Sequence, residues 1–202
     1  MLSGMLLYDS RVSGNCYKVR LLLAHLGHTY DRVEVDVVDR SDREQVLGKL
    51  NPALRVPTLV LDDGRPLAES NAILWFLADA TRWLPSDAYA RAQVLQWMFF
   101  EQYSHEPFVA VARHWLTIAA DAPDPGALAA KHEGGRLALL AMNRHLANRA
   151  FLIGDRATIA DLALYAYTHS ADEGGFDLED YPAVVTWLEL VAAEPGHVAI
   201  TA

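Results

Sequence analysis

The residues Ser13-Gly14-Asn15-Cys16 bring a hydroxyl, an amide and a thiol into four consecutive positions. They lie between an apolar, β-favouring run at 5–8 and an amphipathic stretch at 17–26, so we expect a strand to lead directly into a helix. The first N–H groups of a helix have no partner within the helix, and its N-terminal end carries a partial positive charge. This segment is therefore suited to stabilise an anion such as a thiolate.

A second helix start with similar chemistry follows at Glu69-Ser70-Asn71, where serine and asparagine are good N-capping types. Helix capping alone would explain these residues. Two such helix starts within one small domain, however, suit a ligand that carries a thiolate at one end and a carboxylate at the other.

Short apolar runs alternate with helical segments over the first 80 residues. The pattern predicts strands at 5–8, 30–35, 58–61 and 66–68, and helices at 17–26, 43–50 and 71–78. Ser41-Asp42-Arg43-Glu44 predicts a capping box for the second helix, and Asp63-Gly64 predicts a hairpin turn between the last two strands. The order is a βαβ unit, a helix and a ββα unit.

The pattern changes after residue 86, where Ala, Leu, Met and aromatic residues recur every three or four positions. We predict helices at 87–120, 125–148, 158–170 and 182–193, with no strand between them. The chain is thus expected to form an α/β domain over 1–80 and an all-helical domain over 87–202.

Composition narrows the possible partners. The chain has 202 residues, 52% of them hydrophobic, and a formal charge of −9 with no basic stripe, so we expect no nucleic-acid binding. No apolar run approaches the ~20 residues that span a bilayer, and no signal-peptide pattern is present, which predicts a cytoplasmic protein without membrane contact. The single cysteine excludes an intramolecular disulfide, and the eight histidines lack metal-binding spacing, so we expect no metal.

Four motifs, in this order, make the chain resemble the serine-type cytosolic glutathione transferases. They are Ser13 at the first helix, Val56-Pro57, Glu69-Ser70, and Thr158-Ile159-Ala160-Asp161. The resemblance covers residues 5 to 198. It implies a thioredoxin-like first domain that binds glutathione, and a helical second domain that binds the electrophile and forms a homodimer.

The resemblance also implies the glutathione contacts. From the residues alone a trans Pro57 is favoured, but in this family the matching proline is cis, so that the residue before it, here Val56, offers its backbone N–H and C=O to the cysteinyl part. Glu69 and Ser70 would hold the γ-glutamyl amine and carboxylate.

Asn15 and Arg55 are expected as further neighbours of glutathione. Many relatives have glycine before the residue that matches Arg55, whereas this chain has Leu54, so its loop is expected to differ in shape from theirs.

Three residues are candidates for activating the thiol. Ser13 matches the hydroxyl of the serine-type classes. Lowering a thiol pKa of ~8.5 by ~2 units needs about 2.7 kcal/mol, and one charged hydrogen bond of ~1.5–3 kcal/mol with a helix end of ~0.3–1 kcal/mol supplies it. Tyr8 lies near the hydroxyl of the tyrosine-type classes. Cys16 occupies the second thiol position of a thioredoxin-like dithiol, where a cysteine is usually buried and inert.

The electrophile is expected to contact Tyr8 and the second domain, where Arg113, His114 and Trp115 follow an aromatic-rich stretch at 97–108. The periodicity does not divide these aromatic residues between core and binding surface. The Thr158-x-x-Asp161 motif reads as a helix cap with a structural role.

We therefore expect an enzyme that conjugates the glutathione thiolate to small apolar electrophiles. The alternatives are a glutathione-dependent disulfide reductase or thiol transferase, and a non-catalytic binding protein of the same fold.

Overall fold

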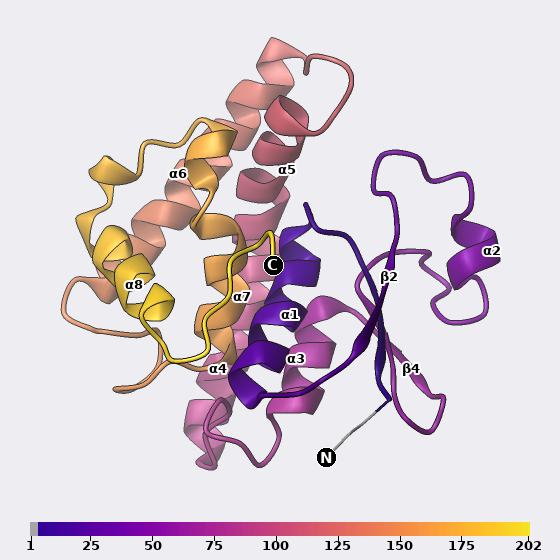
Figure 1. Cartoon of the computed structure of the whole chain (residues 1–202). Coiled ribbons are helices and arrows are strands. Elements are labelled where there is room, and N and C mark those ends of the chain that lie inside the picture. The colour runs from indigo at the N-terminus through magenta and orange to yellow at the C-terminus, as the bar shows by residue number, and fades with distance from the viewer. Residues whose placement is uncertain (1–3) are drawn as a thin grey trace. The chain divides into compact units, whose positions relative to one another are not determined.

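Four short strands form a mixed sheet in the first part of the chain (Figure 1). They are β1 (Leu6–Asp9), β2 (Asp31–Glu34), β3 (Thr58–Val60) and β4 (Pro66–Ala68), in the order β2-β1-β3-β4. Strand β1 pairs in parallel with β2 and antiparallel with β3, and β3 pairs antiparallel with β4.

The computed structural model describes residues 4–202 and separates them into two compact units. The first unit takes the described residues up to Asp79 together with Pro195–Ala202, and the second takes Ala80–Glu194. The predicted domain boundaries, at 1–80 for a glutathione-binding domain and 87–202 for an electrophile-binding and dimerisation domain, stay predictions.

Three helices complete the first unit: α1 (Gly14–Leu26), α2 (Arg43–Leu47) and α3 (Ser70–Ala78). Figure 1 shows α1 and α3 side by side along one face of the sheet, with α2 on the other side. Leu22 and Leu23 of α1 and Ile73 and Leu74 of α3 are completely buried. The predicted α/β fold class is confirmed.

The turn predicted at Asp63-Gly64 is present. Gly64 has a φ of 83°, a left-handed conformation that glycine adopts without steric cost, and its N–H donates to the Leu61 carbonyl at 2.8 Å. The Asp63 carboxylate accepts from the Arg65 N–H at 3.1 Å, which closes the hairpin.

The capping box predicted for α2 is wrong. Asp42, not Ser41, precedes this helix; its backbone is helical and its side chain makes no capping hydrogen bond. The Ser41 N–H instead donates to the Asp39 carboxylate at 2.9 Å. Local turns formed by aspartate side chains thus replace the box, because short polar side chains compete for nearby backbone groups.

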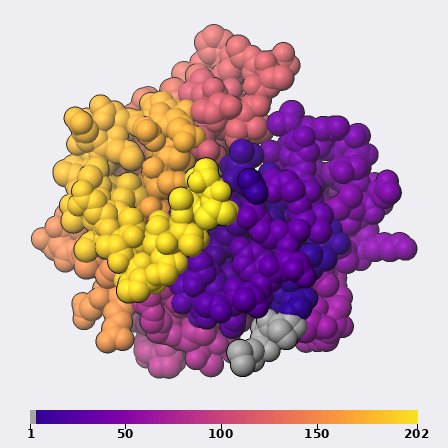
Figure 2. All heavy atoms as spheres, viewed as in Figure 1, coloured from indigo at the N-terminus to yellow at the C-terminus, as the bar shows by residue number. Residues whose placement is uncertain are grey.

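The last eight residues pack along α1 within the first unit. The Tyr17 hydroxyl donates to the Val198 carbonyl at 2.6 Å, and the Arg20 guanidinium donates to the Ile200 carbonyl. In Figure 2 the yellow atoms of the chain end lie against the indigo atoms of this unit. This segment therefore supports the helix that carries Ser13.

The second unit is entirely helical. Its α-helices are α4 (Ala88–Phe100), α5 (Glu106–Thr117), α6 (Pro125–Leu146), α7 (Ile159–Thr168) and α8 (Pro182–Ala192). Two short 3₁₀ segments, η2 (Ala171–Gly174) and η3 (Leu178–Asp180), precede α8. Among the described residues, no helix combines the length and apolar character needed to cross a membrane.

The single helix predicted over 87–120 is interrupted by a π-helical segment, η1 (Glu101–His105). Pro107 follows it, in the first turn of α5. Because proline has no N–H, the α-helical bond from position 107 to the carbonyl of Tyr103 cannot form. The π segment ends where α5 begins, so Pro107 lies in the first turn of a new helix, where an N–H would have no helical partner. π-Helical segments recur at functional sites.

The capping box predicted for α7 is confirmed. The Asp161 carboxylate accepts from the Thr158 N–H at 2.8 Å, and the Thr158 hydroxyl accepts from the Ala160 N–H at 3.3 Å. Asp161 also accepts from the Leu152 N–H and from the Trp187 indole N–H, both at 2.9 Å. Burial raises the pKa of this carboxyl, and the hydrogen bonds that it accepts act in the opposite direction.

Candidate functional site

Ser13 ends the turn between β1 and α1 and is the N-cap residue of α1. Its backbone is extended, with a φ of −82° and a ψ of 120°, and its Oγ accepts from the Cys16 N–H at 3.3 Å. In this contact the oxygen is the acceptor, so the hydroxyl keeps its own proton for donation. Ser13 is half-buried, and the first turn of α1 contains no acidic residue. Capping and donation to a thiolate are therefore compatible roles for one side chain.

An ion-pair network centred on the buried Asp9 and Arg20 lies at this turn. Arg20 Nη1 lies 2.6 Å from Asp9 Oδ1 and also donates to the Ser10 carbonyl at 3.2 Å. Arg32 Nη2 lies 2.6 Å from the other oxygen of Asp9. Sequence reasoning missed these residues, because no local pattern relates an arginine on α1 to an aspartate at the end of β1.

Cys16 faces the interior of the first unit. Its side chain is fully buried, and its thiol is free. Burial, with a smaller contribution from the negative charge of Asp9, raises the pKa of this thiol to about 12, despite hydrogen bonds from Ser13 and Ser10 that act in the opposite direction. Its surroundings therefore oppose a thiolate at Cys16, as expected for a structural cysteine.

Tyr8 lies in β1, opposite Val33 of β2 and Thr58 of β3. Along this strand, half-buried and buried residues alternate, and Tyr8 shares the half-buried face with Leu6. It remains a candidate for contact with a ligand.

The Val56-Pro57 peptide bond is cis, which confirms the expectation drawn from the resemblance. The buried side chain of Asn51 organises the loop before it, with Nδ2 donating to the Arg55 carbonyl at 2.9 Å and to Thr58 Oγ1 at 3.1 Å. The Arg55 residue is exposed, and Val56 is half-buried. Sequence reasoning missed Asn51, whose only local signal is its position before Pro52.

Leu54 adopts a φ of 54°, in the left-handed region that favours glycine. For a non-glycine residue this conformation costs roughly 1–2 kcal/mol. The Arg43 guanidinium donates to the Leu54 carbonyl at 2.9 Å and helps to hold it there. The loop therefore keeps a backbone conformation that suits glycine, and leucine adds strain to it.

Glu69 shows backbone strain of the same kind, with a φ of 68° and a ψ of 114°. It is exposed, and its side chain does not cap α3. Strained non-glycine residues of this kind cluster at ligand sites. Simple helix capping, the alternative explanation for this motif, therefore does not account for Glu69.

The two helix starts are joined through Asn15. Its Oδ1 accepts from Ser70 Oγ at 2.9 Å and from Lys18 Nζ at 2.7 Å, and Lys18 Nζ also lies 3.5 Å from Ser70 Oγ. Ser70 and Lys18 are buried, and Asn15 is half-buried. The structure thus links two of the predicted ligand residues, Asn15 and Ser70, and adds Lys18, which sequence reasoning missed.

Within residues 4–202, no group of three or more potential metal ligands is found.

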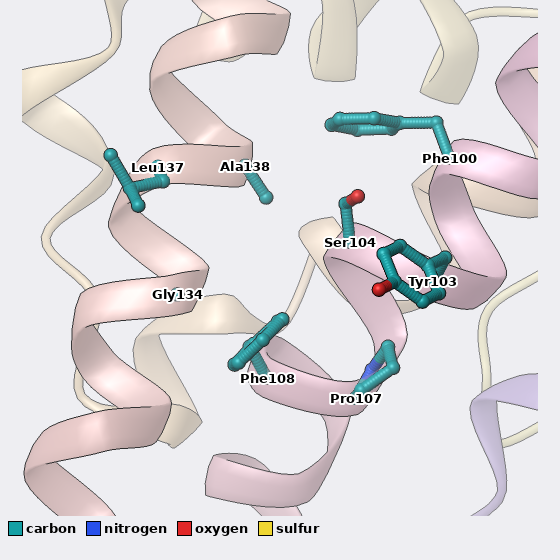
Figure 3. Close-up of a pocket in the computed structure, with 8 residues that line it drawn as sticks. All are labelled: Phe100, Tyr103, Ser104, Pro107, Phe108, Gly134, Leu137 and Ala138. Atoms are coloured by element: carbon teal, nitrogen blue, oxygen red, sulfur yellow. The ribbon is translucent and has the colours of Figure 1, made fainter.

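In the second unit the aromatic-rich stretch divides between core and surface. Trp97, Met98 and His105 are buried, whereas Phe99 and Tyr103 are exposed. An apolar groove of about 550 Å³ lies between the junction of α4 and α5 and the middle of α6. Figure 3 shows its side chains, which include Phe100, Tyr103, Pro107 and Phe108 on one side and Leu137 on the other.

The three residues predicted to contact the electrophile lie in α5. Arg113 is buried, and its Nε lies 2.7 Å from Glu173 Oε2 in η2. Part of the hydrogen-bonding capacity of the guanidinium is therefore used by an ion pair within the second unit. His114 and Trp115 are half-buried, and the Lys131 ammonium lies 5.7 Å from the centre of the Trp115 ring. Their role toward an electrophile stays a prediction.

Comparison with known proteins agrees with this architecture. Residues 12–80 match the model of the glutathione S-transferase N-terminal domain, and residues 95–195 match that of the C-terminal domain. A glutathione S-transferase structure from Pseudomonas fluorescens Pf-5 is 44% identical, with a TM-score of 0.94, over 98% of this chain and 99% of that chain. The chain belongs to the glutathione S-transferase family.

Two further relatives are a bacterial oxidoreductase and a protein whose structure contains glutathione. Disulfide-bond oxidoreductase YfcG from Escherichia coli K12 is 28% identical over 189 residues, which cover 90% of this chain and 87% of that protein. The structure of Ure2p in complex with glutathione is 25% identical, with a TM-score of 0.86, over 97% of this chain and 92% of that chain.

Proposed function

We propose that this protein is a glutathione transferase that joins the sulfur of glutathione to an electrophilic carbon of a small apolar molecule. The observation that carries this proposal is the link between the start of α1 and the start of α3 through Asn15. Each helix start favours a negative charge, and glutathione has a thiol and a γ-glutamyl carboxylate to place at them. The glutathione complex of Ure2p supports the choice of ligand.

In this proposal Ser70 holds the γ-glutamyl carboxylate through its backbone N–H at the start of α3, and the exposed Glu69 carboxylate binds the γ-glutamyl amine. Val56, the residue before Pro57, offers its backbone N–H and C=O to the cysteinyl part. Asn15 and Arg55 are further contacts.

Ser13 activates the sulfur as a hydrogen-bond donor and not as a nucleophile. Its hydroxyl and the N-terminal end of α1 stabilise the thiolate, so the thiol of bound glutathione loses its proton near neutral pH. The thiolate sulfur then attacks the electrophilic carbon and forms a carbon–sulfur bond. In a substitution the leaving group departs with its electron pair, and in an addition the adduct takes up a proton from water.

Two assays test this function. Isothermal titration should show glutathione binding, and glutathione with an activated aryl halide should give turnover that falls at least tenfold in Ser13→Ala and survives in Ser13→Thr, which keeps a hydroxyl. Binding without turnover would instead favour the non-catalytic alternative. The electrophile contacts at Tyr8, Arg113, His114 and Trp115, the homodimer and the cytoplasmic location remain parts of the proposal.

The relative YfcG favours one second function, glutathione-dependent disulfide reduction. Since Cys16 is buried and its thiol pKa is raised, glutathione would have to supply both thiols. One glutathione thiolate would attack the disulfide, form a mixed disulfide and release one thiolate of the substrate. A second would attack the glutathione sulfur of the mixed disulfide, which gives oxidised glutathione and releases the other thiolate. Faster turnover with a small disulfide than with the aryl halide, unchanged in Cys16→Ala, would favour this function over conjugation.

A further inference from the structure

We propose that Lys18 is a positioning residue for the carboxylate end of the ligand: it fixes the orientation of Asn15 and Ser70 and places a buried positive charge beneath the start of α3. This inference rests on the proposed function, because it concerns the same site. It assigns a role to a residue that none of the sequence motifs includes.

Lys18 lies three residues after Asn15 on α1, so both side chains share one face of the helix. The Lys18 side chain has no exposed surface. Its ammonium lies 2.7 Å from Asn15 Oδ1 on its own helix and 3.5 Å from Ser70 Oγ on α3. A single buried group thus contacts both helix starts.

Hydrogen-bond chemistry fixes the direction of these contacts. An ammonium group donates and cannot accept, so the Asn15 amide must present its oxygen, and not its nitrogen, to Lys18. The same oxygen accepts the hydroxyl proton of Ser70 at 2.9 Å. In this arrangement Ser70 meets a ligand with its backbone N–H and the lone pairs of its hydroxyl, while its hydroxyl proton is directed at Asn15.

The charge of Lys18 also acts on the ligand. A carboxylate held at the start of α3 lies close to an ammonium that water does not screen, and charges interact more strongly in such surroundings than in bulk water. Lys18 should therefore strengthen binding of ligands that carry a γ-glutamyl carboxylate, and should add little for ligands that lack it.

The test compares two ligands by isothermal titration. One is glutathione, and the other is 4-aminobutyryl-cysteinyl-glycine, which differs from glutathione only by the absence of the γ-glutamyl carboxylate. In Lys18→Gln we expect affinity for glutathione to fall at least tenfold, equivalent to about 1.4 kcal/mol, and affinity for the analogue to change less than twofold. Lys49→Gln, which removes an exposed charge from the same unit, is the matched control and should leave both affinities unchanged.

A second variant keeps the test informative if Lys18→Gln does not fold. Lys18→Met keeps the length and the apolar stem of the natural side chain, and it removes the ammonium that lies 2.7 Å from Asn15 Oδ1. We expect the same selective loss of glutathione affinity.

The outcomes separate this inference from the proposed function. Equal weakening of both ligands, or no weakening of either, in variants of a protein that binds glutathione would overturn the role of Lys18 alone. Failure of the natural chain to bind glutathione would overturn the proposed function, and this inference with it.

Discussion

Ser13 and Cys16 lie in the same turn of α1, but their surroundings give them opposite chemistry. The half-buried hydroxyl at the helix start can donate to an anion, whereas the thiol three residues later is surrounded by the core. The N-terminal end of a helix favours a thiolate, but at Cys16 the cost of burial and the negative charge of Asp9 outweigh this effect. The residue type alone therefore does not identify the reactive group.

The raised pKa of Cys16 predicts a pH-dependent stability. Above the ordinary thiol pKa of ~8.5 the unfolded chain loses this proton, while the folded chain keeps it until about pH 12. Fewer protons bind to the unfolded state, so the free energy of unfolding should fall as the pH rises from about 9, by up to ~1.4 kcal/mol per pH unit. Below pH 8 this group should have no such effect.

Urea unfolding at pH 8, 9 and 10 measures this slope, with Cys16→Ala as the comparison. The variant should lose less stability per pH unit than the natural chain, since other titrating groups are common to both. Equal slopes in the two proteins would contradict a buried, neutral thiol at this position.

At the scale of elements, the start of α7 depends on one carboxylate. Asp161 accepts two backbone N–H groups and the Trp187 indole, all within the second unit. Asp161→Ala should lower the free energy of unfolding by about 3 kcal/mol or more, because buried donors lose a charged acceptor. Thr158→Ala should cost less, about 1.5–3 kcal/mol, because it removes the cap and the hydroxyl that donates to Asp161 at 3.0 Å.

Chemical denaturation of the three proteins measures both costs. Thr158→Ser keeps the capping hydroxyl and should stay within about 0.5 kcal/mol of the natural chain. A loss in Asp161→Ala no greater than that in Thr158→Ala would contradict the central position of Asp161.

The glycine pair in α6 gives a second prediction for this scale. A Cβ at Gly135 would collide with the ring of Phe176, which is buried and cannot move aside. Gly135→Ala should therefore destabilise by about 1–3 kcal/mol through overpacking, in spite of the ~1 kcal/mol by which alanine favours a helix over glycine.

Gly134 is the matched control, since a Cβ there would collide with Phe108. That ring is half-buried at the groove of Figure 3 and can turn outward. Thermal unfolding should show a lower Tm for Gly135→Ala and a nearly unchanged Tm for Gly134→Ala. A lower Tm for Gly134→Ala than for Gly135→Ala would contradict the expectation that the half-buried Phe108 ring moves more easily than the buried Phe176 ring.

Apolar periodicity was sufficient to predict most elements from the sequence. It located β4 at 66–68 and the start of α6 at Pro125, because local patterns and turn residues agree there. It did not predict the π segment, because the apolar pattern continues across residues 101–105 while the backbone bond pattern changes. It also missed Lys18 and Arg20, whose partners at Ser70, Asp9 and Ile200 are distant in sequence.

At the scale of the whole molecule, the last residues of the chain lie next to α1, the helix whose N-cap is Ser13. Deleting residues 195–202 removes the carbonyls that accept from Tyr17 and from the buried Arg20. A hydrogen bond from a charged group contributes about 1.5–3 kcal/mol and a neutral one about 1 kcal/mol. The truncated chain should therefore lose about 3 kcal/mol of stability in its first unit.

Hydrogen exchange measured by mass spectrometry resolves this loss by unit. Peptides from α1 should exchange faster after truncation, whereas peptides from α7 should keep their protection. Tyr17→Phe removes only one of these bonds and should have an intermediate effect. Unchanged exchange in α1 would contradict a supporting role for the chain end.

The thiol pKa of bound glutathione tests the proposed chemistry most directly. Thiolate absorbance in the ultraviolet, followed against pH, should give an apparent pKa about 2 units below the ~8.5 of a free thiol. Ser13→Ala should raise it by at least 1 unit, and Ser13→Thr should leave it low. A bound thiol that ionises at the same pH in Ser13→Ala as in the natural protein would contradict thiolate stabilisation by the Ser13 hydroxyl.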